Sequence, residues 1–233
     1  MSGKDKLRKF RENESFGCLL QPANEDVIGK IHPIRGKWHE QMFHNDNPIV
    51  VELGCGKGEY TIALAQKFPE KNFIGVDIKG ARLWKGAKYA TEHNMTNVAF
   101  LRTRIEFIES LFGPCEIAEI WITFADPQPK KAKKRLTNPL FLNRYRNFLS
   151  PDGIVHLKTD STLLYEYTLA VVEQNRMTLL EHNNDIYGTG RADEILSIKT
   201  YYEAQFLEKG ISIKYLSFKI DNGSPLIEPA IVL

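Results

Sequence analysis

The stretch "PIVVELGCGKGEYTIALA", residues 48–65, decides the fold of this chain. It begins with an apolar, β-branched run typical of a buried strand and continues into a turn with three glycines, at positions 54, 56 and 58. Tyr60, Leu64 and Phe68 then recur at helical spacing. A strand, a glycine turn and a helix in this order predict one repeat of a parallel α/β sheet, with a ligand held at the turn.

Further apolar runs predict the rest of the sheet. They lie at 72–78, 97–101, 117–124, 153–158, 177–183 and 211–218. Helical-period segments separate most of them, and a short helix ended by Gly210 precedes the last. We therefore expect an α/β, Rossmann-like sheet of seven strands, mostly parallel, with helices on both faces and an antiparallel pair at the end. The predicted domain covers 46–218, between a basic, partly irregular arm at 1–45 and a C-terminal extension at 219–233.

Composition narrows the class of protein. The 233 residues carry a net charge of +2 and are 42% hydrophobic, as in a soluble globular protein. Three cysteines lie far apart without metal-ligand spacing, which predicts no metal site, no disulfide framework and a cytoplasmic location. No apolar run approaches the roughly 20 residues of a membrane helix, and no signal peptide is visible.

Two acids flank the glycine turn. Asp77 ends the second strand, where a carboxylate can accept hydrogen bonds from both hydroxyls of a ribose. The glycine spacing fits neither a dinucleotide fingerprint nor a phosphate-binding loop. Glu52, just before the turn, suits a ligand with a cationic amino-acid end and no pyrophosphate, which indicates S-adenosylmethionine. A solvated charge at the end of a strand is the alternative for Glu52.

A second unusual stretch, "ITFADPQPKKAKKRLTN", spans residues 122–138. Asp126 is held between Ala125 and Pro127, and a second proline follows two residues later, so the turn is expected to be stiff. From Pro127 to Pro151 the chain has seven basic residues and no acid. A basic segment alone is more often a solvated face, but beside a nucleoside pocket it predicts a phosphate track on RNA. The residues expected in that track are Lys131, Lys133, Lys134 and Arg135.

Five motifs occur in the order seen in one enzyme family. ELGCGKGEYT, GVDIK, FADPQPKKAKKRLT, GIVHLKTDS and KTYYEAQFLEKG resemble the tRNA (guanine-N7-)-methyltransferases over about residues 48–218. The resemblance implies S-adenosylmethionine as the methyl donor and a guanine in the variable loop of tRNA as the acceptor. It assigns donor contacts to Glu52, Gly54, Gly56, Asp77, Arg104 and Asp126. It assigns RNA contacts to Lys130, Asp160, Thr200, Tyr201, Tyr202 and Glu203.

Three positions depart from the family pattern. Gln128 stands where tryptophan is common, so a stacking role there is lost. Ala125 replaces a frequent proline before the aspartate. Arg104 stands where an aspartate commonly meets the adenine amino group, and a cation cannot accept from an amine. Any donor contact of Arg104 is therefore expected through its backbone.

The chemistry of the acceptor requires a residue that stabilises positive charge and not one that removes a proton. Guanine N7 has an in-plane lone pair and no proton, so the protein must mainly orient the base and stabilise its developing positive charge. Asp126 is the residue expected to do both. The alternatives are an amino-group nucleic-acid methyltransferase, a dehydrogenase, and a non-catalytic RNA-binding protein on the same fold. Against the first, this chain lacks the aromatic residue that amino-group methyltransferases have after the aspartate. Against the second, its glycine spacing does not fit a dehydrogenase. Against the third, a non-catalytic protein would have no reason to keep the donor-binding acids Glu52 and Asp77.

Several smaller points stay open on the sequence. Asp160 or Ser161 is expected to cap the helix that follows, so Asp160 has a structural alternative to RNA contact, as Glu203 has as a surface charge. His156, inside a strand, is expected to be packed rather than catalytic. The protein is a monomer or a homodimer, and the apolar end at 231–233 is expected to dock on the fold or on a second subunit.

Overall fold

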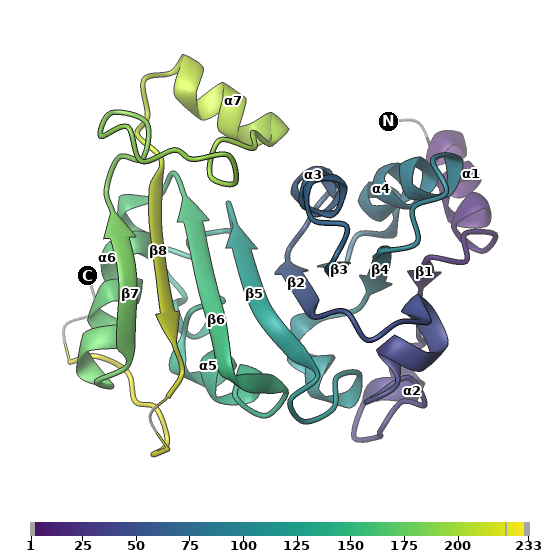
Figure 1. Cartoon of the computed structure of the whole chain (residues 1–233), viewed down its shortest axis with the longest axis horizontal. Coiled ribbons are helices and arrows are strands. Elements are labelled where there is room, and N and C mark those ends of the chain that lie inside the picture. The colour runs from purple at the N-terminus through teal and green to yellow at the C-terminus, as the bar shows by residue number, and fades with distance from the viewer. Residues whose placement is uncertain (1–2, 222, 231–233) are drawn as a thin grey trace. The chain divides into compact units, whose positions relative to one another are not determined.

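The structure is a computed structural model that describes residues 3–221 and 223–230, and the chain divides into two units (Figure 1). Unit 1 comprises residues 1–117 and unit 2 residues 118–233. The apolar end at 231–233, for which docking was predicted, lies outside the described residues.

Unit 1 contains four strands in the order β1-β4-β3-β2, and the neighbours pair in parallel. The strands are β1 (Leu19–Leu20), β2 (Ile49–Leu53), β3 (Asn72–Asp77) and β4 (Val98–Arg102). The register places Val51 opposite Ile74 and Ile74 opposite Ala99, and all three are fully buried. Such apolar runs fit the centre of a parallel sheet, which crossover helices cover.

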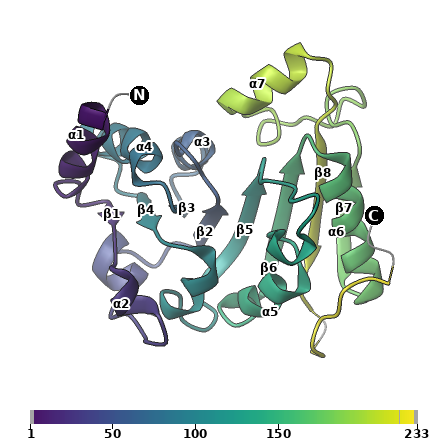
Figure 2. The same cartoon turned by 180° about the vertical axis from the view of Figure 1, so that it is seen from behind.

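The helices of unit 1 are α1 (Gly3–Asn13), α2 (Asn24–Val27), the π-helix η1 (His39–Phe43), α3 (Glu59–Lys67), α4 (Gly80–Glu92) and the 3₁₀-helix η2 (Ile105–Ser110). Two of them, α3 and α4, lie close to the sheet because glycines let them approach. α3 and α4 pack on β3 and β4, and α1 packs on α4 (Figures 1 and 2). A Cβ atom on Gly58 or Gly86 would lie 2.5 Å from the Phe100 ring, so larger residues there would push the helices off the sheet.

Residues 3–45 contain more regular structure than the partly irregular arm that was predicted. They form α1, β1, α2 and η1, and β1 extends the sheet by pairing with β4. Trp38 is fully buried, and its indole Nε1 donates to the carbonyl oxygen of Leu111 at 2.9 Å. These long-range contacts, which have no periodic signature in the sequence, make the segment part of unit 1. With β1, the described residues contain eight strands, one more than the seven predicted.

Unit 2 contains four strands in the order β5-β6-β8-β7. They are β5 (Ile117–Thr123, which begins at the unit boundary), β6 (Leu149–Thr159), β7 (Thr178–Asn183) and β8 (Lys214–Lys219). β8 runs antiparallel to both β6 and β7, which confirms the predicted antiparallel end of the sheet. Val155, Leu157 and Phe218 are fully buried in the core of this sheet.

The helices of unit 2 are the 3₁₀-helix η3 (Ala132–Lys134), α5 (Pro139–Tyr145), α6 (Thr162–Gln174) and α7 (Tyr201–Glu208). α6 packs on β6 and β8, while α7 lies beyond the ends at which β5 and β6 finish (Figure 1). Ser161 caps α6 by accepting from the backbone N–H of Leu164 at 3.2 Å, so Asp160 is not the cap. The alternation of strands and helices confirms the predicted Rossmann-like α/β class.

Candidate functional site

The glycine turn of unit 1 has a backbone that only glycine adopts readily. Gly54, Gly56 and Gly58 have φ values of 78°, 59° and 74°, in the left-handed region. The N–H groups of Gly54 and Cys55 both donate to the carbonyl oxygen of Val76, at 2.8 and 3.0 Å. The turn after β2 is thereby fixed to the end of β3, where the sequence placed the second donor-binding acid.

Asp77 ties the turn to the segment after β3. Its Oδ2 accepts from the N–H of Gly56 at 3.0 Å, and its Oδ1 accepts from the N–H of Lys79 at 2.7 Å. A carboxylate has about four acceptor positions, so these two bonds orient Asp77 and leave capacity for two more. An oriented carboxylate with acceptor capacity at a strand end suits a pair of ligand hydroxyls.

Glu52 is almost fully buried, with 4% of its surface exposed. Its Oε2 accepts from both the backbone N–H (2.9 Å) and the hydroxyl of Thr61, in the first turn of α3. The carboxylate is thus anchored and is not the solvated strand-end charge considered as its alternative. Its contact with a cationic ligand end stays a prediction.

A cavity of about 350 Å³ opens at the ends of β3 and β4. Ile78 lines it, directly after Asp77, and 52% of this apolar side chain is exposed. Arg104 also lines the cavity, while its guanidinium forms an ion pair with Glu106 at 3.6 Å. The other lining residues are Pro22, Ala23, Asn24, Arg102 and Thr103. An exposed apolar surface next to an oriented carboxylate can hold the flat ring of a nucleoside.

The sequence reasoning missed two parts of this cavity. Ile78 had a signal, since an apolar residue follows the strand-end acid directly. The segment at 22–24 had none, because it reaches the cavity only through the pairing of β1 with β4.

The Asp126 turn of unit 2 is strained on both sides. Phe124 and Gln128 have φ values of 50° and 46°, which residues other than glycine rarely adopt. Asp126 itself is exposed, and its Oδ1 accepts from the N–H of Gln128 at 3.0 Å. Left-handed non-glycine residues cost about 1–3 kcal/mol each and are concentrated at functional sites. The turn therefore presents one oriented carboxylate at a cost in stability.

The basic segment after this turn divides into two parts, which corrects one prediction. Four lysines are exposed, as a phosphate track requires: Lys130, Lys131, Lys133 and Lys134. Arg135 is fully buried. Its Nε donates to the carbonyl oxygen of Pro127 at 3.1 Å, and its guanidinium lies 4.3 Å from the centre of the Tyr167 ring. The prediction that Arg135 lines an exposed phosphate track is wrong, because η3 turns its side chain into unit 2.

The start of α7 combines exposed and buried residues. Thr200 caps the helix by accepting from the N–H of Glu203 at 3.2 Å. Tyr201 and Tyr202 are 52% and 46% exposed and meet edge to face. Glu203 is fully buried, which agrees neither with the RNA contact predicted for it nor with its alternative as a surface charge. The two tyrosines are the residues of this segment with large exposed surfaces.

Lys158, near the end of β6, explains the burial of Glu203. Both side chains are fully buried, and the Lys158 Nζ donates to Glu203 Oε2 at 2.9 Å. It also donates to the carbonyl oxygens of Leu196 and Ile198, at 2.7 and 3.0 Å. Burial lowers the pKa of Lys158, and the charge of Glu203 opposes that effect. The signal in the sequence was a lysine close to the end of a predicted strand.

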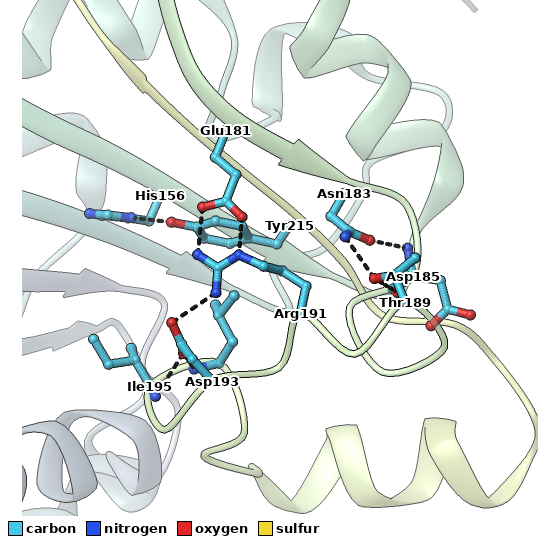
Figure 3. Close-up of polar contacts among 10 residues, drawn as sticks. His156, Glu181, Asn183, Asp185, Thr189, Arg191, Asp193, Ile195 and Tyr215 are labelled. Atoms are coloured by element: carbon cyan, nitrogen blue, oxygen red, sulfur yellow. Dashed lines mark hydrogen bonds and ion pairs between the residues drawn. The ribbon is translucent and has the colours of Figure 1, made fainter.

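The loop between β7 and α7, which supplies these carbonyl groups, is held by further ion pairs and hydrogen bonds (Figure 3). Arg191 donates to Glu181 of β7 at 2.7 Å and to Asp193 at 2.9 Å. Asp193 in turn accepts from the N–H groups of Ile195 and Leu196, at 2.9 and 2.8 Å. Lys158 and Arg191 therefore hold the loop at both ends, and the loop leads directly into α7.

Two further residues singled out in the sequence, Asp160 and His156, are partly or fully buried. Asp160 is half-buried, and burial raises the pKa of its carboxyl group. His156 stacks on Trp121 with a centroid distance of 4.1 Å and hydrogen-bonds to the Tyr215 hydroxyl at 2.8 Å (Figure 3), in agreement with a packed histidine. Within 3–221 and 223–230, no cluster of His, Cys, Asp and Glu could hold a metal ion. No helix of this part of the chain has the length and apolarity needed to cross a membrane.

Comparison with known proteins adds a family assignment. Residues 46–216 match a protein-family profile described as "Putative methyltransferase". A tRNA (guanine-N(7)-)-methyltransferase of Bacteroides thetaiotaomicron is 50% identical over 97% of this chain and 90% of its own length. The enzyme of the same name from Porphyromonas gingivalis is 58% identical over 80% of this chain and 77% of its own length.

Among solved structures, the 16S rRNA methyltransferase KamB has a similar fold. Its TM-score is 0.59 at 14% identity, over 82% of this chain and 92% of that chain. At this identity the similarity supports the Rossmann-like fold alone.

Proposed function

Since the chain belongs to the tRNA (guanine-N(7)-)-methyltransferase family, we propose that it transfers the methyl group of S-adenosylmethionine to N7 of a guanine in the variable loop of tRNA. The observation that carries the proposed mechanism is the Asp126 turn. An exposed carboxylate is oriented by the Gln128 N–H at 3.0 Å, and four exposed lysines follow it.

The residues of unit 1 fit S-adenosylmethionine. The Asp77 carboxylate has acceptor capacity for the two ribose hydroxyls, and the exposed face of Ile78 offers a surface to the adenine. Gly54 and Gly56 allow the backbone to approach the ligand, and the anchored Glu52 suits its cationic amino-acid end. When bound, S-adenosylmethionine supplies an electrophilic methyl group.

Asp126 acts on the acceptor. Guanine N7 carries no proton, so no residue has to remove one before the methyl group is accepted. Asp126 can accept hydrogen bonds from the donor edge of the guanine and so orient N7, while its negative charge stabilises the cationic purine as it forms. The strained turn holds this carboxylate in place before the base arrives, so little reorganisation is needed during the reaction.

The RNA contacts follow from exposure and charge. Lys130 and the three lysines of the phosphate track, Lys131, Lys133 and Lys134, are placed to neutralise RNA phosphates. Tyr201 and Tyr202 expose aromatic surface that can stack on unpaired bases. Asp160 is retained as an RNA contact. The three free cysteines agree with the proposed cytoplasmic location, where thiols stay reduced.

The proposal is tested with labelled S-adenosylmethionine and bulk tRNA, followed by mapping of the modified base. We expect N7-methylguanosine in the variable loop. Asp126→Asn should lower the single-turnover rate by roughly 10²-fold or more, because one preorganised charge is lost. The matched control is Asp152→Asn, an exposed aspartate that pairs with Lys219 in the same unit.

Two outcomes would contradict the mechanism. A near-wild-type rate for Asp126→Asn would exclude charge stabilisation by this residue. A large solvent isotope effect in D₂O on the wild-type transfer step would mean that a proton is removed and that N7 is the wrong acceptor atom.

A further inference from the structure

Arg135 is buried in an arrangement that only partly satisfies it. Its side chain is fully buried, and its Nε donates to the Pro127 carbonyl oxygen at 3.1 Å. Neither Nη1 nor Nη2 has a hydrogen-bond partner among the residues that the structure describes. Burying a guanidinium with unmet donors is costly. Its stacking on the Tyr167 ring offsets part of this cost. An apolar residue would be more stable at this position, so stability alone does not account for the arginine.

The carbonyl group that Arg135 holds lies within the strained turn. Pro127 stands between Asp126 and Gln128, and Gln128 is one of the two left-handed residues there. Strained backbone persists only where its surroundings fix it. On the strand side, Phe124 is fixed by its N–H bond to the Lys158 carbonyl oxygen at 2.9 Å. On the other side, the contact from Arg135 fixes Pro127 from eight residues away.

Two asparagines, Asn143 of α5 and Asn175 at the C-terminal end of α6, bind the C-terminal extension. Asn143 bonds both the N–H and the carbonyl oxygen of Leu226, at 3.1 and 3.3 Å. Asn175 does the same for Ile227, at 2.8 and 2.9 Å. Each asparagine side chain thus pairs with both backbone hydrogen-bonding groups of one residue, as a neighbouring strand would. The extension is therefore fixed in register, and the next residue, Glu228, has a defined position.

Glu228 reaches the aromatic ring on which Arg135 stacks. Its Oε1 accepts from the Tyr167 hydroxyl at 2.8 Å, and its Oε2 accepts from the Asn138 side chain at 2.6 Å. Burial and then the Glu228 carboxylate raise the pKa of Tyr167, so the phenol keeps its proton and donates it. Tyr167 thus bonds Glu228 through its hydroxyl and supports Arg135 through its ring.

We propose that Arg135 and Glu228 are positioning residues: Arg135 holds the Asp126 turn in its reactive geometry through Pro127, and Glu228 supports Arg135 through Tyr167. The C-terminal extension would then contribute to catalysis without touching the substrate. The inference rests on the proposed function of Asp126. A displacement of about 1 Å at a reacting group can lower a rate by up to roughly 10²-fold, so a loosened turn has a measurable effect.

The test compares Arg135→Lys, Glu228→Ala, their double variant and the control Asp221→Ala in the full-length protein. Asp221 also lies in the C-terminal extension and accepts two hydrogen bonds from Thr178, without contact to Tyr167. We measure kcat and KM for tRNA, the salt dependence of tRNA binding, donor affinity and the melting temperature. Both single variants should lower kcat by roughly 10-fold or more and leave KM, donor affinity and salt dependence near wild-type values. The control should keep its kcat.

The double variant separates coupling from general destabilisation. If Glu228 acts through Tyr167 and Arg135, the double variant should lose no more kcat than the more impaired of the two single variants. Arg135→Lys conserves the charge, so a phosphate contact would leave its kcat intact, whereas a positioning role would not. Should Arg135→Lys fail to fold, Glu228→Ala against Asp221→Ala decides alone.

Two results would overturn the inference while the wild type still methylates N7. One is a kcat within about twofold of wild type for Glu228→Ala. The other is a loss in Arg135→Lys that appears in KM and salt dependence instead of kcat. If the wild type does not methylate guanine N7 at all, the proposed function fails, and that result is recognisable before any variant is made.

Discussion

Replacing Lys158 with methionine should destabilise unit 2 strongly, although methionine has a similar length. The ammonium is fully buried and bonds Glu203 and the carbonyl oxygens of Leu196 and Ile198. In Lys158→Met, the Glu203 carboxylate stays buried with the Tyr187 hydroxyl at 2.8 Å but loses its counter-charge. Removing one partner of a buried ion pair costs roughly 3–5 kcal/mol, which is a large part of a domain's stability.

A second substitution should then restore stability instead of lowering it further. Glu203→Gln in the Lys158→Met background removes the uncompensated charge and supplies an amide that can donate to one of the two carbonyl oxygens. The remaining cost is an unpaired buried polar group, about 1–3 kcal/mol. The double variant should therefore be more stable than Lys158→Met alone.

The measurement is urea unfolding followed by far-ultraviolet circular dichroism, with the free energy of unfolding compared across the cycle. Lys219→Met is the control, because Lys219 pairs with an Asp152 side chain that is 95% exposed, and exposed pairs contribute about 0–1 kcal/mol. A cost below about 1 kcal/mol for Lys158→Met, or a double variant less stable than Lys158→Met, would refute the reasoning.

Three further predictions concern the remaining parts of the site. Asp77→Ala should weaken S-adenosylhomocysteine binding by about 1–3 kcal/mol in calorimetry and leave tRNA affinity unchanged. An unaltered affinity for S-adenosylhomocysteine would remove Asp77 from the ribose role. Replacing Lys133 and Lys134 by alanine should lower the salt slope of tRNA binding by up to about 1.4–1.8, and a constant slope would make them a solvated face. Burial raises the pKa of the Cys55 thiol, so iodoacetamide at pH 8 should label the exposed Cys115 long before Cys55; equal rates would show an accessible thiolate.

The burial of residues in the RLTN segment, 135–138, could not be predicted from the sequence pattern. Arg135, Thr137 and Asn138 follow exposed lysines directly and are buried. Two of these residues have distant partners: Thr137 bonds Thr168, 31 residues away, and Asn138 bonds the Tyr167 hydroxyl, 29 residues away. A run of basic residues has the same composition whether the last of them faces solvent or the interior. Only the packing of this segment on α6 separates Arg135 from Lys134.

The sequence by itself determined the features that depend on neighbours in the chain. Alternating apolar runs and helical spacing predicted the Rossmann-like fold, and the three glycines predicted a turn that needs positive φ. Asp77 and Asp126 were recognisable because Asp77 ends a strand and Asp126 lies three residues after one, and strand ends are where such folds bind ligands. These inferences are local, since they need only the spacing of residues along one segment.

The tertiary structure alone decided which polar residues face inward. The Lys158–Glu203 pair joins residues 45 positions apart, and the contact of Asn138 with Glu228 joins residues 90 apart. Whether a charge is buried depends on the partner that makes its burial tolerable, and partners at such distances leave no periodic trace in the sequence. Arg135 and Glu203, expected on the RNA surface, are therefore internal supports of the turn and of α7.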